Sequence, residues 1–421
     1  MTTSSSRDAR GRGRSDRSRP RAVALVPAAV VAALLVGGAV YAGSDDVHAP
    51  PRQGNALVAD WSARKEGQQV LGGARTPGVP SIQRLRHDRV EFTVTVAPAR
   101  PGPNLVRVDT THLGAGHRHR GLPVLVGTTE QTLVRAVPRP GTDGLWAVVD
   151  LPEGSGTVLV THGRYHRVPF AVETGTDRPD TTAWTGPDGP ECLAAATAAI
   201  LGGGSADASC PAATLGPTDA TALRSVVDTL ATRGVEQLAV QHDASARSRA
   251  AYDVVRAAAT SRGLDVVEPS VRPGRRSALL VVSGWSDASR SLARVTALPL
   301  RQQPMRNDGT WLAPWLLSPA VVDSTLGAVL PLDFDVRDPA AQEFSQTLAT
   351  YLPGQSPTAS GYLAWRSVRG TDPDPLELFA ASRTAIMPAQ GGHEQHETAV
   401  AWFPGGTVTP VGALVPRTGA R

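Results

Sequence analysis

The chain has 421 residues, a length sufficient for two or three domains. Its formal net charge of +4 is concentrated at the N-terminus, because residues 1–21 contain seven Arg against Asp8 and Asp16 and so carry +5. The remaining residues sum to −1, and this balance excludes a nucleic-acid-binding function based on overall basic charge. Lys65 is the only lysine, an imbalance expected from the codon usage of a GC-rich genome.

The segment 22–44 contains no charged residue and directly follows the Arg-rich segment. About 20 apolar residues suffice to cross a bilayer, and flanking arginines stay in the cytoplasm. The pattern predicts a disordered basic cytoplasmic tail over 1–21, a retained single-pass membrane anchor over 22–44, and an extracytoplasmic position for the residues beyond 44. A cleaved signal peptide, with Val40-Tyr41-Ala42 as its cleavage site, is the alternative.

Residues 45–88 are weakly patterned and contain Pro, Gly and Arg, which favours a stalk. Residues 89–173 then contain short strands separated by Gly and Pro turns, and the first strand, 90–96, alternates strictly. Six more strands are expected at 105–109, 123–126, 132–136, 146–149, 157–160 and 167–172. Seven short strands in this span indicate a β-sandwich.

The phrase Val96-Ala-Pro-Ala-Arg-Pro-Gly-Pro-Asn104 resembles the small immunoglobulin-like domains of bacterial copper-resistance membrane proteins. Neutral imidazoles are good ligands for Cu(II) or Zn. The candidate metal ligands in this domain are His112, His117, His119, His162 and His166. The competing interpretation is a solvated loop, because the arginines in this stretch repel a cation. His393 and His396 form a second group, but they are three residues apart, whereas the zinc-peptidase motif requires four.

Residues 174–189 read as a linker to an α/β domain over 190–415. Cys192 and Cys210 are the only cysteines, and a lone pair in an oxidising compartment predicts one structural disulfide. An amphipathic helix is expected over 219–233, with Leu223, Val226, Val227 and Leu230 inward.

The stretch 238–267 predicts a strand, a helix and a second strand. Asp243 and Ser245 are both good N-caps and Gly263 suits the position after the helix, so the unit should cross over into a parallel sheet. Further strands are expected at 278–285, 309–317 and 327–335, with helices over 287–297 and 339–352. The order of Val240-Gln-His-Asp243, Val281-Val-Ser-Gly284, Gly327-Ala-Val-Leu330 and Val400-Ala-Trp-Phe-Pro-Gly-Gly406 resembles type I periplasmic solute-binding proteins of the branched-chain amino-acid receptor group.

This resemblance implies a two-lobed receptor for a small molecule, but only about 50 residues stand where the family has its first lobe. Open parallel sheets bind ligands at the carboxyl ends of their strands. The candidate ligand-binding residues there are Asp243, Ser245, Ser283, Trp285 and Asp333. The alternative is that they cap helices and turns. Arg247 stands near where the family has an aromatic side chain.

The pattern around Ser286 lacks the second glycine of a nucleophile elbow, and no group of residues indicates an enzyme. We therefore expect a membrane-anchored, non-catalytic binding or sensing protein with a degenerate solute-binding-like domain. Copper handling through the sandwich histidines is one alternative. The other is a structural partner of a second membrane protein.

Overall fold

A computed structural model describes residues 68–87, 89–113, 122–163, 166–204, 210–383, 402–403 and 406–414. These residues belong to one compact unit, which spans Gly54–Arg421. The predicted tail and anchor lie outside the described residues, as do His117, His119, His393 and His396. Within the described ranges, no helix combines the length and the apolar character needed to cross a bilayer.

The first half of the described chain forms two antiparallel sheets around one apolar core. The larger sheet has the order β1 (Gln68–Gly72), β2 (Ser81–His87), β3 (Val90–Ala97), β4 (Gly102–His112) and β7 (Leu145–Leu151). The smaller has the order β6 (Val134–Arg135), β5 (Val124–Gly127), β8 (Ser155–His162) and β9 (His166–Glu173), and η2 (Glu130–Thr132) links β5 to β6. Val94 and Val106 of one sheet share the core with Val126, Val160 and Phe170 of the other.

The predicted stalk over 45–88 was wrong for residues 68–72 and 81–87, which form β1 and β2. The strand β2 carries buried polar side chains, so it has no clear apolar pattern. Gln83 Nε2 donates to Ser81 Oγ and to the Ala171 carbonyl, each at 2.7 Å. Burial is tolerated because these polar groups are paired, and a hydrophobicity pattern does not reveal such pairing.

The second half contains a mixed seven-stranded sheet. Its order is β11 (Asp265–Val267), β10 (Gln237–Gln241), β12 (Ser277–Val281), β13 (Thr310–Leu312), β14 (Gly327–Leu332), β15 (Glu377–Arg383) and β16 (Gly406–Ala413). The first five strands are parallel, as predicted, but β15 runs antiparallel to its neighbours β14 and β16, so the sheet as a whole is mixed. Two helices, α8 (Pro339–Tyr351) and α9 (Ala359–Arg369), connect β14 to β15 and return the chain to the edge that it left, where Leu332 pairs with Glu377.

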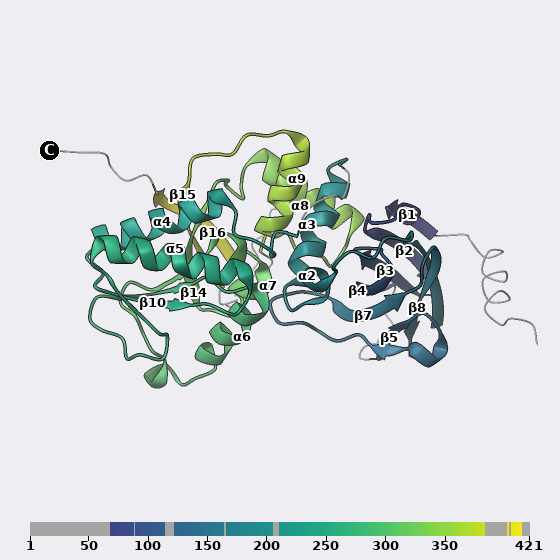
Figure 1. Cartoon of the computed structure of the whole chain (residues 1–421), viewed down its shortest axis with the longest axis horizontal. Helices are drawn as coiled ribbons and strands as arrows, with labels where there is room; N and C mark the ends of the chain where they lie inside the picture. Colours follow the sequence, from purple (N-terminus) through teal and green to yellow (C-terminus); the bar gives the residue numbers. More distant parts are fainter. Residues whose placement is uncertain are drawn as a thin grey trace, which may run out of the picture. The chain divides into compact units, whose positions relative to one another are not determined.

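Helices cover both faces of this sheet, and Figure 1 shows α4 (Pro217–Thr232) and α5 (Ala246–Arg262) on one side and α6 (Trp285–Thr296) on the other. Of the two predicted N-caps of α5, Ser245 is the one that caps it, because Ser245 Oγ accepts from the Ser248 amide; the predicted end is confirmed, because Gly263 has a left-handed φ of 72°. The four predicted inward residues of α4 are buried. The predicted strand 309–317 ends early, since Pro314 begins the 3-10 helix η4 (Pro314–Leu316). Two further short helices in this half are α7 (Pro319–Val322) and η3 (Leu300–Gln302).

The predicted linker over 174–189 contains the short helix α2 (Thr182–Thr185), and α3 (Gly189–Leu201) begins at its last residue. Leu193 of α3 shares a small apolar cluster with Leu105 and Trp146 of the larger antiparallel sheet. Arg139 Nη1 donates to the Gly186 carbonyl at 2.7 Å, and Ser318 Oγ donates to the Gly141 carbonyl at 3.3 Å. Leu193 thus packs α3 against the larger antiparallel sheet, and the Ser318–Gly141 bond joins the segment after β13 to the loop before β7.

Candidate functional site

The strand order of the parallel part reverses between β10 and β12. The order β11-β10-β12-β13-β14 is the doubly wound 2-1-3-4-5 arrangement, and such sheets bind ligands outside the carboxyl ends of the strands at the reversal. Residues 242–245 follow β10 and residues 282–284 follow β12, so they surround this switch point. This is where the sheet topology places a ligand.

The N-terminus of α3 fills part of the switch point. Asp188 Oδ1 accepts a hydrogen bond from the Ser286 amide at 3.1 Å, in the first turn of α6. A Cβ atom added to Gly284 would lie 1.8 Å from Asp188 Oδ2. Only glycine therefore permits this close approach of the carboxylate to the backbone.

A buried ion pair joins α3 to α5 beside Asp188. Arg247 donates to both carboxylate oxygens of Glu191, each at 2.7 Å, and the side chains are 3% and 0% exposed. Ser360 Oγ donates to Glu191 Oε1 at 2.6 Å, and the guanidinium lies 4.6 Å from the centre of the Trp315 ring. Bidentate geometry, a third donor and an aromatic face are what a buried guanidinium–carboxylate pair requires. The chain thus supplies its own carboxylate to Arg247.

Four of the five predicted ligand-binding residues meet at this switch point. Asp243 accepts from the Gly284 and Ser245 amides, each at 2.7 Å, and Ser245 caps α5. Trp285 Nε1 donates to the Trp315 carbonyl at 2.7 Å, and the Ser283 hydroxyl is buried without a hydrogen-bond partner in the described residues. These contacts are internal to the chain.

Asp333, the fifth predicted residue, lies at the end of β14, away from the switch point. Its Oδ2 accepts from Arg366 Nη2 at 2.6 Å, and its carbonyl accepts from Arg366 Nη1 at 2.8 Å. The same guanidinium therefore fixes both the side chain and the backbone of Asp333.

Burial shifts the acidity of the carboxyls around Arg247. Burial, reinforced by the charge of Glu191, raises the pKa of Asp188 to about 6. Burial also raises the pKa of Asp219, at the start of α4, to about 6 although Arg247 opposes the rise. Burial acts in the same direction on Asp243, but hydrogen bonds from Gly284 and Ser245 hold the pKa of that carboxyl below its ordinary value.

Sequence reasoning missed Asp188, Glu191 and the role of Arg247. One signal was present, because Arg247 is followed at four-residue intervals by Ala251, Val255 and Ala259, and all four are buried. An arginine on the apolar stripe of a helix indicates a buried partner. The pattern does not reveal which carboxylate that partner is.

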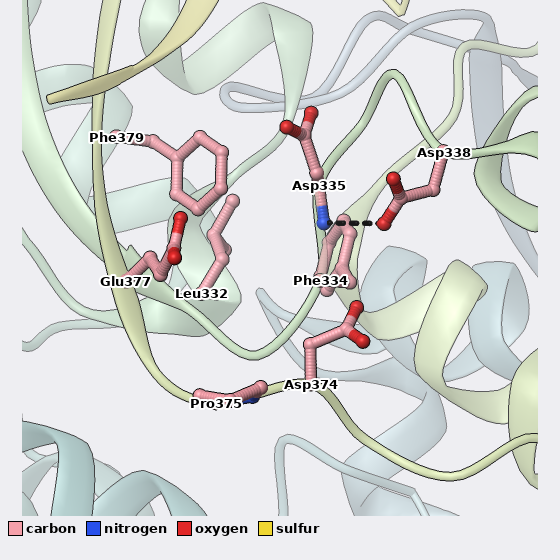
Figure 2. A pocket seen from close by; sticks show the side chains of 8 residues that line it. All are labelled: Leu332, Phe334, Asp335, Asp338, Asp374, Pro375, Glu377 and Phe379. Carbon is pink, nitrogen blue, oxygen red and sulfur yellow. Dashed lines mark hydrogen bonds between the residues drawn. The ribbon is translucent and has the colours of Figure 1, made fainter. Parts of the chain in front are cut away.

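A second group of carboxyls surrounds a cavity of about 220 Å³ at the other end of the same edge. It is lined by Leu332, Phe334, Asp335, Asp338, Asp374, Pro375, Glu377 and Phe379. Figure 2 shows the rings of Phe334 and Phe379 beside these carboxylates. The Asp335 amide donates to Asp338 Oδ2 at 3.3 Å. Burial and the neighbouring charges of Asp335 and Asp374 raise the pKa of Asp338, whereas hydrogen bonding to Arg337 lowers the pKa of Asp335.

The predicted histidine site is only partly within the described residues. The rings of His112 and His162 lie 5.4 Å apart, centre to centre, at the end of β4 and of β8. In the part of the chain that the structure describes, no three metal-ligating side chains form a group. His117, His119 and the side chain of His166 lie outside that part, so metal binding stays a prediction.

Cys192 and Cys210 form the predicted disulfide. Cys192 follows Glu191 on α3, and Pro211 follows Cys210 and accepts from Arg247 Nη1 at 3.3 Å. The bridge therefore ties the Glu191 helix to the segment that contacts Arg247.

No family model matches the chain, and no curated protein matches its sequence. Similar solved structures include an ABC transporter substrate-binding protein from Desulfitobacterium hafniense in complex with Leu, at 14% identity and a TM-score of 0.25, covering 37% of this chain and 50% of that one. A solute-binding protein from Rhodopseudomonas palustris BisB5 in complex with 3,4-dihydroxybenzoic acid has 14% identity and a TM-score of 0.32, covering 48% and 67%. A branched-chain amino-acid ABC transporter periplasmic ligand-binding protein from Burkholderia xenovorans LB400 has 10% identity and a TM-score of 0.31, covering 46% and 63%.

These are proteins of the class that residues 238–406 resemble in sequence. The chain spans about half the length of the first of them.

Proposed function

We propose that this chain is a non-catalytic extracytoplasmic binding protein, anchored in the membrane by residues 22–44, whose solute-binding-like α/β domain is closed at its ligand position by α3. The Glu191–Arg247 pair carries this proposal. An arginine at a switch point is suited to bind a ligand carboxylate, and here Glu191 accepts hydrogen bonds from both terminal nitrogens of Arg247. The protein would then bind partners through its surface, as a structural partner of another membrane protein does.

The antiparallel part of the chain fits the same proposal as an immunoglobulin-like module. The chain leaves the larger sheet after β4, forms β5 and β6, returns for β7, and completes the smaller sheet with β8 and β9. The order β6-β5-β8-β9 corresponds to strands C′, C, F and G of a variable-type domain, and β4 paired with β7 corresponds to B and E. Such modules present loops and edges to partners, and the copper hypothesis uses histidines from two segments, 112–119 and 162–166.

A second candidate function is the binding of an organic cation in the cavity of Figure 2. Its wall of Leu332, Phe334 and Phe379 is apolar, and four carboxyl side chains surround it. An amine with an apolar body would match both features. Calorimetric titration of an aromatic amine tests this function, and Asp374→Asn with Glu377→Gln should abolish any heat of binding.

The main proposal is tested by calorimetric titration of the purified full chain with leucine and with benzoate. We expect no saturable heat from the native protein, because Glu191 already occupies Arg247. The variant Glu191→Ala should instead bind acetate, a carboxylate of the deleted size, and acetate at 100 times its Kd would add about 2.7 kcal/mol to its stability.

The matched control is Glu377→Ala, which removes an exposed glutamate from the rim of the cavity. Acetate should raise the melting temperature of Glu191→Ala but not of Glu377→Ala, at equal ionic strength. Saturable binding of leucine or benzoate by the native chain would contradict the closed ligand position.

A further inference from the structure

The amino edge of the seven-stranded sheet carries an exposed apolar surface. Three loops lead into the amino ends of β12, β13 and β14, which are parallel neighbours. The loops hold five exposed large apolar side chains, namely Val271, Leu298, Leu300, Met305 and Leu326. Leu300 is 72% exposed and Met305 is 67% exposed, the two highest values among the large apolar side chains of the described residues. Exposure on this scale marks an interaction surface.

Hydrogen bonds join these loops into one surface. Arg306 Nη2 donates to the carbonyls of Pro269 and Val271, at 3.3 and 3.0 Å. Asn307 Nδ2 donates to the Arg275 carbonyl at 2.6 Å, and Thr296 Oγ1 donates to the Ser324 carbonyl at 2.6 Å. The three loops therefore lie side by side, and we call this surface the amino-edge patch.

The amino-edge patch is strongly basic. Residues 268–276 and 294–308 contain six Arg against Glu268 and Asp308, a net charge of +4. Residues 22–421 as a whole sum to −1, so the rest of that part of the chain carries −5. Arg306 is buried as the link between loops, which leaves Arg272, Arg275, Arg276, Arg294 and Arg301 exposed.

Nearby acidic groups only partly compensate this charge. Glu236 lies 3.4 Å from Arg276, and Asp308 lies 3.9 Å from Arg233, which adds a further positive charge at this edge. Asp323 stands in the third loop, where Arg383 Nη1 donates to its carbonyl. Glu236 and Asp323 add two negative charges, and Arg233 and Arg383 add two positive ones. The net charge of the amino-edge patch therefore remains +4.

We propose that the amino-edge patch binds the surface of an anionic phospholipid bilayer. Apolar side chains on loop tips can enter the boundary between headgroups and acyl chains, while the surrounding arginines contact the phosphates. Leu300 lies in the short helix η3, between Pro299 and Pro304, so this loop presents a stiff apolar tip. The net positive charge favours an anionic lipid surface, because each exposed arginine near the headgroups adds to the attraction.

This inference goes beyond the proposed function, and its failure would not contradict the closure of the ligand position by Glu191 and Arg247. The test uses the full chain in nanodiscs of phosphatidylcholine alone or with 30% phosphatidylglycerol. A bimane fluorophore is attached at Leu300→Cys, and the control carries it at Val411→Cys on β16, a position of similar exposure. We expect a blue shift and at least twofold quenching by spin-labelled lipid at position 300, only in the anionic discs.

Charge reversal provides the second arm. The triple variant Arg272→Glu, Arg275→Glu and Arg301→Glu should abolish the response at position 300. The matched variant Arg135→Glu, Arg224→Glu and Arg249→Glu, at exposed arginines elsewhere, should keep it. A water-like probe in anionic discs, an equal response in neutral discs, or insensitivity to charge reversal would each overturn the proposal. A blue shift at position 300 that occurs in native membranes but in neither kind of nanodisc would overturn the proposal and assign the patch to a protein partner.

Discussion

The carboxyl edge of one sheet holds two groups of carboxyls in opposite situations. At the switch point, Asp188, Glu191 and Asp243 accept hydrogen bonds from backbone amides, an arginine and a serine. At the β14–β15 end, Asp374 and Glu377 stand exposed beside a cavity. Buried carboxyls must be paired or neutralised, whereas exposed ones are stabilised by water. The comparison shows that the carboxyls at the switch point are paired within the chain, whereas Asp374 and Glu377 face water.

The largest expected effect breaks the buried pair with an isosteric change. Glu191→Gln removes the charge that compensates Arg247, whose side chain is 3% exposed. Leaving one partner of a buried pair uncompensated costs about 3–5 kcal/mol. Urea denaturation at pH 7 measures it, and the double variant Glu191→Leu with Arg247→Met should recover most of the loss. A cost below about 1 kcal/mol would show that the pair is not buried in solution.

The next effect concerns the disulfide that holds α3 against the switch point. Replacing Cys192 and Cys210 with Ala removes a bridge across 18 residues of sequence. The chain-entropy model assigns about 3 kcal/mol to a loop of this length. Denaturation under non-reducing conditions measures the change, and dithiothreitol should destabilise the native chain but not the variant. Equal sensitivity of both proteins to the reductant would contradict this role.

A smaller effect is expected from the raised pKa of Asp188, about 6 in the folded state. Because the folded pKa lies above the ordinary value of 3.8, stability from this group is complete below about pH 4 and is lost as pH rises through 6. Asp188→Asn keeps an acceptor for the Ser286 amide but cannot ionise. The stability advantage of the variant over the native chain should grow by about 2 kcal/mol between pH 4 and pH 7.5.

Asp243 does not contribute to the pH dependence of stability between pH 4 and pH 7.5, because its lowered pKa affects stability only as pH falls through 3.8. The pKa of Asp219 is also about 6, so the unfolding free energy of Asp188→Asn should still fall with rising pH, but less steeply than that of the native chain. Unfolding free energies at four pH values between 4 and 7.5 measure the difference. A constant difference across this range would refute the assignment to Asp188.

The smallest effect is expected at the exposed end of the edge. Glu377→Gln is the same isosteric change as Glu191→Gln, but Glu377 lies in water at the start of β15. Substitutions at such positions change stability by about 0.5 kcal/mol or less. Urea denaturation of both variants gives the ratio of the losses in unfolding free energy at Glu191 and at Glu377, and this ratio tests whether the two groups of carboxyls differ. A large loss at Glu377 would mean that the cavity rim is itself a paired, structural cluster.

The sequence alone determined much of the local structure of the α/β part. The start of α5 at Ser245, its end at Gly263 and the inward face of α4 follow from capping chemistry and helical spacing within each segment. The disulfide followed from the count of cysteines and the predicted compartment. The strands β1 and β2 could not be predicted in this way, because paired polar side chains replace an apolar pattern there.

The tertiary structure alone decided what the switch point contains. Glu191 and Arg247 are 56 residues apart, and Ser360 is 169 residues from Glu191. A local pattern identified Asp243, Ser245, Ser283 and Trp285 as residues at the carboxyl edge, but not that α3 supplies the carboxylate facing Arg247. The cost of burying a charge depends on donors brought from distant segments, so a ligand position and a closed, self-paired one have the same appearance in sequence.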